Sequence, residues 1–179
     1  ECTASHSFSL QNIKVAKNHA FLLDPAAKKS DSPLFDIPFM PFAEITLLVN
    51  YVGMFRRFLD LVEKYFFEKS KDPNWASQYS KERFKLLDAI QTDFHARREH
   101  VFALAQTIWA NVIAGNFEGN NGPYEDLASF SRAFVKDMRL QVVELFPLLG
   151  IRASQAEQEI NIVFRNIFTA SQHSLLNGR

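Results

Sequence analysis

The sequence predicts an all-α protein, an up-and-down four-helix bundle preceded by a short β-segment. Four stretches after Pro41 carry apolar residues at spacings of three and four, the period of an amphipathic helix. Short or moderate turn-rich breaks separate these stretches, and helices joined in this way pack as antiparallel neighbours. The 179 residues suffice for one domain that buries a core without a metal or disulfide.

The part of the chain before Pro41 follows a different pattern. Its apolar residues nearly alternate with polar ones, as in a half-buried strand: Phe8, Leu10, Ile13 and Val15. Pro and Ser interrupt residues 24–41, as in a linker. A lone strand is not stable in water, so we expect it to pack on the helices, pair with another copy or belong to a larger sheet. We therefore divide the chain into residues 1–35, a β-domain remnant plus linker, and residues 36–179, the helical domain.

The first expected helix follows Pro41, which suits a first turn because no N–H is needed there. Its apolar stripe is Ile45, Leu48, Val49, Val52, Phe55, Leu59, Val62 and Phe66. After a break at residues 69–73, the second helix carries its own stripe. That stripe is Phe84, Leu87, Phe94, Val101, Ala105, Ile108 and Val112.

Pro123 opens the third expected helix after a turn-rich stretch. The apolar stripe of this helix is Leu127, Phe130, Phe134, Met138, Val142 and Leu145. The fourth helix is expected to begin with a capping box, in which Ser154 and Glu157 each bond the backbone N–H of the other. Its apolar face is Ile160, Val163, Phe164, Ile167, Phe168 and Ser171.

Composition narrows the classes of function. Twenty basic and twenty acidic residues cancel to a net charge of zero, which argues against a nucleic-acid partner and suits self-association. The single Cys2 cannot form an internal disulfide, which favours a reducing compartment. No apolar run approaches the roughly 20 residues of a membrane span, and the first residues lack the features of a signal peptide. We expect a soluble cytoplasmic protein with no membrane partner.

Two local patterns allow more than one interpretation. His95 and Glu99 lie one helical turn apart and could ligate a metal, but a helical di-iron site needs paired Glu-x-x-His elements. We interpret them as part of a solvated polar face and predict no metal site. The run Tyr65-Phe66-Phe67 exceeds one inward stripe, so Phe66 or Phe67 should face a second surface. An interface and a crowded core both remain open.

The last expected helix contains the fragment Arg165-Asn166-Ile167-Phe168-Thr169-Ala170-Ser171-Gln172-His173. The first expected helix carries Gly53, Leu59-Asp60, Tyr65 and Glu68-Lys69 in a fixed order. In residue types, order and spacing the chain resembles the C-terminal helical-bundle domain of the acyl-CoA dehydrogenase family. It is closest to the flavin-dependent monooxygenase-like branch. Residues 1–22 look like the last strands of the family's middle β-domain.

The resemblance implies a part of a flavin-dependent oxidoreductase that closes the flavin and substrate cleft and mediates assembly into a dimer or tetramer. The complete enzyme would use FAD or reduced flavin and an acyl-CoA or small aromatic substrate. This chain alone is expected to bind no flavin and to be inactive, because most of the family's flavin pocket lies in other domains. Arg165 and Lys69 match cofactor-binding positions. Lys69 replaces an Arg that holds a neighbouring subunit's cofactor, and it lacks the bidentate fork.

The dehydrogenase base is missing by this resemblance. The family's two positions for the catalytic glutamate match Ser174 and Ala43, and Glu44 is one residue off, which turns a helical side chain by about 100°. The monooxygenase branch lacks this base and places a His near the flavin, matched by His173. His173 is therefore the expected catalytic residue, donating a hydrogen bond to a flavin–oxygen adduct or a phenolic substrate. The alternatives are that His173 caps the helix C-terminus, and that the chain is a non-catalytic interaction module.

Overall fold

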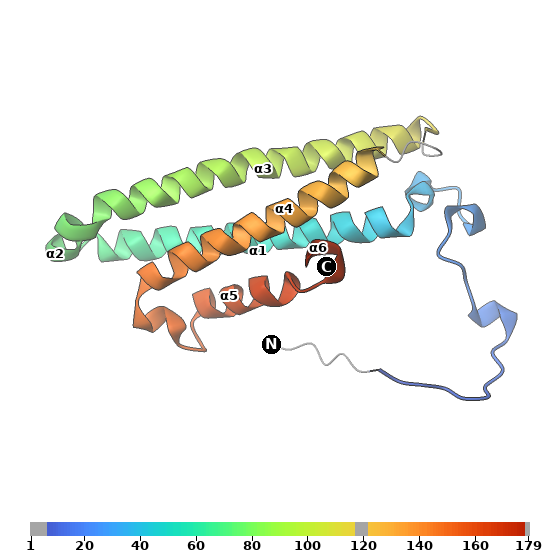
Figure 1. Cartoon of the computed structure of the whole chain (residues 1–179), viewed down its shortest axis with the longest axis horizontal. Coiled ribbons are helices and arrows are strands. Elements are labelled where there is room, and N and C mark those ends of the chain that lie inside the picture. Colours follow the sequence, from blue (N-terminus) through green and yellow to red (C-terminus); the bar gives the residue numbers. More distant parts are fainter. Residues whose placement is uncertain (1–6, 117–121, 178–179) are drawn as a thin grey trace.

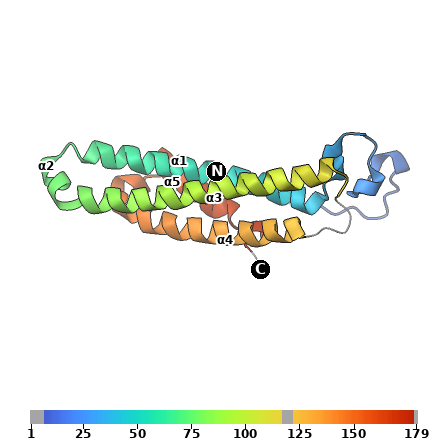
Figure 2. The same cartoon turned by 90° about the horizontal axis from the view of Figure 1, so that it is seen from above.

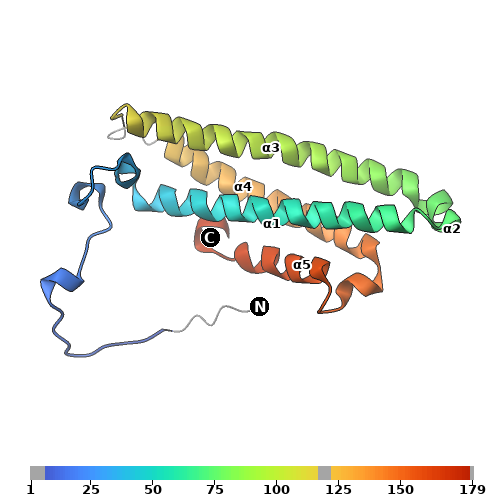
Figure 3. The same cartoon turned by 180° about the vertical axis from the view of Figure 1, so that it is seen from behind.

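Three long helices dominate the computed structural model, which describes residues 7–116 and 122–177. They are α1 (Phe39–Lys69), α3 (Lys81–Ile113) and α4 (Gly122–Leu145), and they lie side by side (Figures 1 and 2). The shorter α5 (Glu159–Ala170) packs along α1, and α6 (Ser174–Asn177) packs on α4 and α1 (Figure 3). The described part of the chain is all-α, as the sequence predicts, and contains no β-strand.

The chain reverses direction at each long connection, so α1 and α4 run parallel while α3 runs opposite to both (Figure 1). The connection from α1 to α3 contains α2 (Pro73–Trp75) and the π-helical turn η4 (Ala76–Ser80). Asp72 caps α2, because its Oδ1 accepts the backbone N–H of Asn74 at 2.9 Å. Two 3-10 turns, η5 (Phe146–Leu149) and η6 (Ile151–Ser154), join α4 to α5.

The predicted apolar stripes form the core between the long helices. Phe55 of α1 lies against Phe94 of α3, with ring centroids 5.3 Å apart. Tyr51 of α1 meets Phe134 of α4 edge to face at 6.5 Å. The largest fully buried side chains are Tyr51, Phe55, Phe58, Phe66, Phe94, Phe134, Leu48, Leu87, Leu127, Met138, Leu145 and Leu149.

An ion-pair network ties α3 to α4 along their partly buried flank. Arg97 of α3 donates to Asp93 one turn earlier, at 2.9 Å, and to Asp137 of α4, at 2.8 Å. Gln141 of α4 donates to the same Asp93 at 3.0 Å. Because these charges are only partly exposed, the network fixes the register of the two helices better than isolated surface pairs would.

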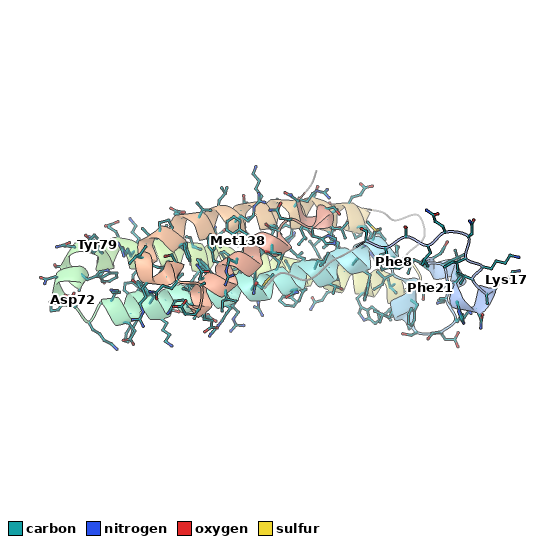
Figure 4. The ribbon with its side chains drawn as sticks, turned by 90° about the horizontal axis from the view of Figure 1, so that it is seen from below. Phe8, Lys17, Phe21, Asp72, Tyr79 and Met138 are labelled. Atoms are coloured by element: carbon teal, nitrogen blue, oxygen red, sulfur yellow. The ribbon has the colours of Figure 1, made fainter. Side chains whose placement is uncertain are left out.

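The β-segment expected in residues 1–35 is not formed in its described part. Residues 7–38 contain only the short 3-10 turns η1 (Lys17–His19), η2 (Pro25–Ala27) and η3 (Pro33–Asp36). The segment runs away from the helices at the end where α1 begins (Figure 1), and Figure 4 shows Phe8, Lys17 and Phe21 on it. The described residues contain no strand with which this segment could form backbone hydrogen bonds, so its alternating sequence does not become a strand. Cys2 and the rest of residues 1–6 lie outside the described residues.

The predicted start of the last helix is also wrong. Helix α5 begins at Glu159, and Gln158 precedes it without a side-chain cap. The hydroxyl of Ser154 donates instead to the carbonyl oxygen of Ile151 at 2.7 Å, within η6. Gly150, with φ of +77°, turns the chain before η6, so residues 151–154 form a tight turn instead of a capping box. In the described residues no helix has the length and apolarity that spanning a membrane requires.

Candidate functional site

Arg165 lies on the exposed side of α5, whose other side faces the core. Ile167 and Ser171 are fully buried, whereas the Arg165 side chain reaches solvent. Its Nη2 donates to the carbonyl oxygen of Ala156 at 3.0 Å, which ties the turn before α5 to the middle of that helix. A guanidinium has five N–H donors. This bond uses one of them.

His173 follows the end of α5 and is exposed. Its Nδ1 accepts the backbone N–H of Leu175 at 3.3 Å, so the ring caps the start of α6 and not the C-terminus of α5. Because Nδ1 acts as the acceptor, the proton of the neutral imidazole belongs on Nε2. The imidazole is thereby set up as an Nε2–H donor.

Lys69, the last residue of α1, lies far from His173. Its Nζ is 5.6 Å from the centroid of the Tyr65 ring, one turn earlier in the same helix. Figure 1 shows this end of α1 beside α2, whereas α6 packs near the middle of the long helices. The structure therefore does not bring Lys69 together with His173 within one chain.

Glu44 is buried between α1 and α4, with only 5% of its surface exposed. Burial raises the pKa of its carboxyl, and the Arg132 cation and the Ser131 hydroxyl oppose that rise. The Ser131 hydroxyl donates to the carbonyl oxygen of Leu127 at 2.7 Å. The buried Oε1 of Glu44 has no hydrogen-bond partner among the described residues. Glu44 is thus a buried α1–α4 contact.

A second buried polar group lies two turns along α1. Tyr51 is fully buried, and its hydroxyl has no hydrogen-bond partner among the described residues. Burial raises the pKa of its phenol, against the effect of the Arg139 cation on α4. Glu44 and Tyr51 are seven residues apart on α1, and so are Arg132 and Arg139 on the parallel α4. The spacing of seven residues is therefore the same on both helices of this contact.

A hollow of about 320 Å³ lies between α4 and α6. Arg132, Lys136 and Arg139 line it from α4, and Leu176 and Asn177 from α6. None of the three cations takes part in an ion pair within the described part of the chain. We name this group of residues the α4–α6 basic hollow. Sequence reasoning missed it, although the Arg-x-x-x-Lys-x-x-Arg spacing places the three cations on one helical face.

A larger hollow of about 600 Å³ lies within the N-terminal segment and the start of α1. Its walls are mostly apolar, from Phe21, Leu23, Phe35, Phe39 and Phe42. An ion pair between Lys28 and Asp36 joins two parts of the N-terminal segment beside this hollow. The charged residues in its lining are Asp24, Lys28 and Lys29.

His95 and Glu99, the two possible metal ligands, each contact other side chains. His95 is exposed and packs 5.7 Å from the ring of Phe94, while Glu99 pairs with Arg98 at 2.9 Å. The described residues contain no group of three or more His, Cys, Asp or Glu side chains that could hold a metal ion. Comparisons of the chain with protein-family models, curated proteins and solved structures found no match.

Proposed function

We propose that this chain is the helical domain of an acyl-CoA dehydrogenase-like flavin-dependent oxidoreductase, arranged as a four-helix bundle. In the complete enzyme it closes the flavin and substrate cleft and mediates self-association. An N-terminal segment with a strand-like pattern supports this proposal, since residues 7–22 would complete a β-domain supplied elsewhere. The order of the four main helices, with α5 followed by His173, is also in keeping with it.

The observation that carries the proposal is the orientation of the last helical segment. Helix α5 buries Ile167 and leaves Arg165 exposed, and His173 follows in a position open to a ligand. The bond from the Leu175 N–H to Nδ1 at 3.3 Å leaves the Nε2–H as the group that can donate outward. An Nε2–H donor is what stabilising a flavin–oxygen adduct or a phenolate would need.

The monooxygenase-like branch is favoured over the dehydrogenase branch. Proton abstraction from an acyl thioester requires a carboxylate that reaches the substrate. Ser174 has no carboxyl, and Glu44 is 5% exposed and faces α4. Hydroxylation by a reduced flavin needs no such base from this domain.

Lys69 and Arg165 suit phosphate contacts in an assembled enzyme. Both side chains are exposed, and neither forms an ion pair among the described residues. FAD supplies the redox chemistry when it is bound, and the two cations would only help to hold its phosphates. Since Lys69 lies at the far end of α1 from His173, we assign it to the cofactor of a neighbouring subunit.

The test uses the natural protein that contains this segment, purified as the complete polypeptide. We expect flavin to copurify at about one per chain, and His173→Ala to lower flavin-dependent hydroxylation at least tenfold with flavin content unchanged. Gln172→Ala, at the exposed neighbouring position, serves as the matched control. A flavin-free complete protein would contradict the proposal, and so would a His173→Ala variant as active as Gln172→Ala.

A non-catalytic, self-associating helical module is the second candidate. Phe67 of α1 is 61% exposed, and Phe8 and Phe21 of the N-terminal segment are 86% and 82% exposed. Such large apolar surfaces are typical of contacts with another chain. Light scattering on the purified chain should give a dimer or tetramer, which Phe67→Ser weakens and Tyr79→Ser, at another exposed aromatic, does not. A monomer at every concentration would argue against this candidate.

A further inference from the structure

The α4–α6 basic hollow concentrates positive charge on a single helical face. Arg132, Lys136 and Arg139 are four and three residues apart, so the three side chains emerge on one side of α4 within about 10 Å of helix axis. Like charges at these spacings repel one another. An anion bound among them would remove that repulsion.

No acidic side chain forms an ion pair with these three cations in the described part of the chain. Two other arginines do form such pairs, Arg57 with Glu159 at 2.7 Å and Arg97 with Asp137 at 2.8 Å. Two acidic groups of α1, Glu44 and Tyr51, interact with Arg132 and Arg139 without forming an ion pair. Burial raises the pKa of each group, against the effect of these two cations.

The second wall of the hollow comes from α6. Leu176 is 2% exposed and anchors α6 against α4, while Asn177 brings an amide group to the rim. The volume of about 320 Å³ is at the lower end of the range of small-molecule sites. A hollow of this size, with three cations and one amide, suits a compact anion better than an extended polymer.

We propose that Arg132, Lys136 and Arg139 form a binding site for a small molecule that carries a phosphate or diphosphate group. The planar guanidinium forks of the two arginines bind phosphate oxygens in pairs, and Lys136 between them adds a third positive charge. Asn177 contributes an N–H donor from the opposite wall. This site goes beyond the proposed function, because it contains neither Arg165 nor His173.

The experiment is calorimetric titration of the purified chain with inorganic pyrophosphate and, separately, with citrate. The variant Arg132→Gln/Arg139→Gln removes two charges from the hollow. The matched control Arg56→Gln/Arg152→Gln removes two exposed charges that form no ion pair among the described residues. We expect saturable pyrophosphate binding at one site, weakened at least tenfold by the first variant and less than twofold by the second.

Spectroscopy locates the site and controls for folding. On addition of pyrophosphate, the side-chain amide signal of Asn177 and the methyl signals of Leu176 should shift in the wild type and not in the Arg132→Gln/Arg139→Gln variant. Circular dichroism establishes that both variants remain helical. Equal weakening by the two variants, or no saturable binding by the wild type, would overturn the proposal. Tighter binding of citrate than of pyrophosphate would overturn the assignment to phosphate.

Discussion

Arg83 of α3 donates a hydrogen bond from Nη1 to the carbonyl oxygen of Leu148 at 2.6 Å, joining segments 65 residues apart in the chain. The same guanidinium lies 4.6 Å from the ring centroid of Tyr79 and 5.2 Å from that of Trp75. Figure 4 shows Asp72 and Tyr79 at this end of the helices. One side chain thus holds together the α1–α3 and the α4–α5 connections.

We expect Arg83→Met to lower the free energy of unfolding by about 2 kcal/mol. It removes a charged donor from a partly buried carbonyl and the cation–π contacts with two rings. Urea unfolding followed by circular dichroism measures the change. Arg152→Met, at an exposed position, should change the free energy by less than about 0.5 kcal/mol. Equal effects of the two substitutions would show that Arg83 does not hold the connections.

Two glycines should respond in opposite directions to replacement by alanine. Gly150 has φ of +77° and ψ of 178°, a conformation nearly exclusive to glycine, so Gly150→Ala should destabilise by about 1–3 kcal/mol. Its added Cβ would lie 3.6 Å from the Tyr65 hydroxyl, an ordinary contact, so the expected effect comes from the backbone. Gly53 lies within α1 with open space around it, and Gly53→Ala should stabilise by roughly 1 kcal/mol. Thermal unfolding measures both; a neutral Gly150→Ala would contradict the assigned conformation.

The buried Glu44 should make stability depend on pH. Its folded-state pKa is raised by burial above the usual 4.5, so the folded protein binds its proton more tightly than the unfolded chain does. Folding therefore loses stability as pH rises from 4.5 through the raised folded-state pKa. Glu44→Gln should match the wild type at pH 4 and exceed it at pH 7, by on the order of 1 kcal/mol.

The matched control for this effect is Glu144→Gln, an exposed glutamate of α4 without an ion pair among the described residues. Its difference from the wild type should be nearly the same at both pH values. Free energies of unfolding in urea at pH 4, 5, 6 and 7 give the comparison. A Glu44→Gln difference that stays constant across this range would mean that Glu44 titrates normally in the folded protein.

Adjacent phenylalanines of α1 should differ sharply in their contribution to stability. Phe66 is fully buried against Phe84 and Trp75, with ring centroids 5.9 and 6.1 Å away, whereas Phe67 is 61% exposed. Phe66→Ala should therefore destabilise the fold by roughly 3–5 kcal/mol, and Phe67→Ala by less than about 0.5 kcal/mol. Guanidinium unfolding of both variants tests this. A large loss from Phe67→Ala at concentrations where the chain is monomeric would contradict the described burial.

The helical body could be predicted because its signals are local. Pro41 marks the first turn of α1, which begins at Phe39, and Pro123 marks the start of α4, which begins at Gly122. Most of the predicted stripe residues pack in the core, since an amphipathic helix has one face that can leave water, but Val49 of the first stripe is 42% exposed. The strand predicted at the N-terminus is not formed, because a strand depends on a signal that is not local. Alternation in residues 7–15 is compatible with a strand, but a strand also needs a partner strand, and no local pattern supplies one.

The candidate site was only partly visible in the sequence. Glu44 shares a face of α1 with Leu48, Tyr51 and Phe55, at spacings of four, three and four, and that pattern indicates burial. The α4–α6 basic hollow, by contrast, exists only because α6 packs on α4. Asn177 and Arg132 are 45 residues apart, and no local pattern indicates that they line one hollow.

The ion pair between Arg57 and Glu159 spans 102 residues of sequence, so α5 joins the rest of the protein only after a long loop has closed. Helix α5 has 12 residues and only Ile167 fully buried, against 31 residues and nine buried side chains in α1, so its backbone amides should exchange with deuterated solvent sooner than those of α1. Detachment of α5 would carry Arg165 away from α1 while the three long helices stay assembled. Opening of this segment would move the candidate catalytic histidine, which follows α5, together with Arg165.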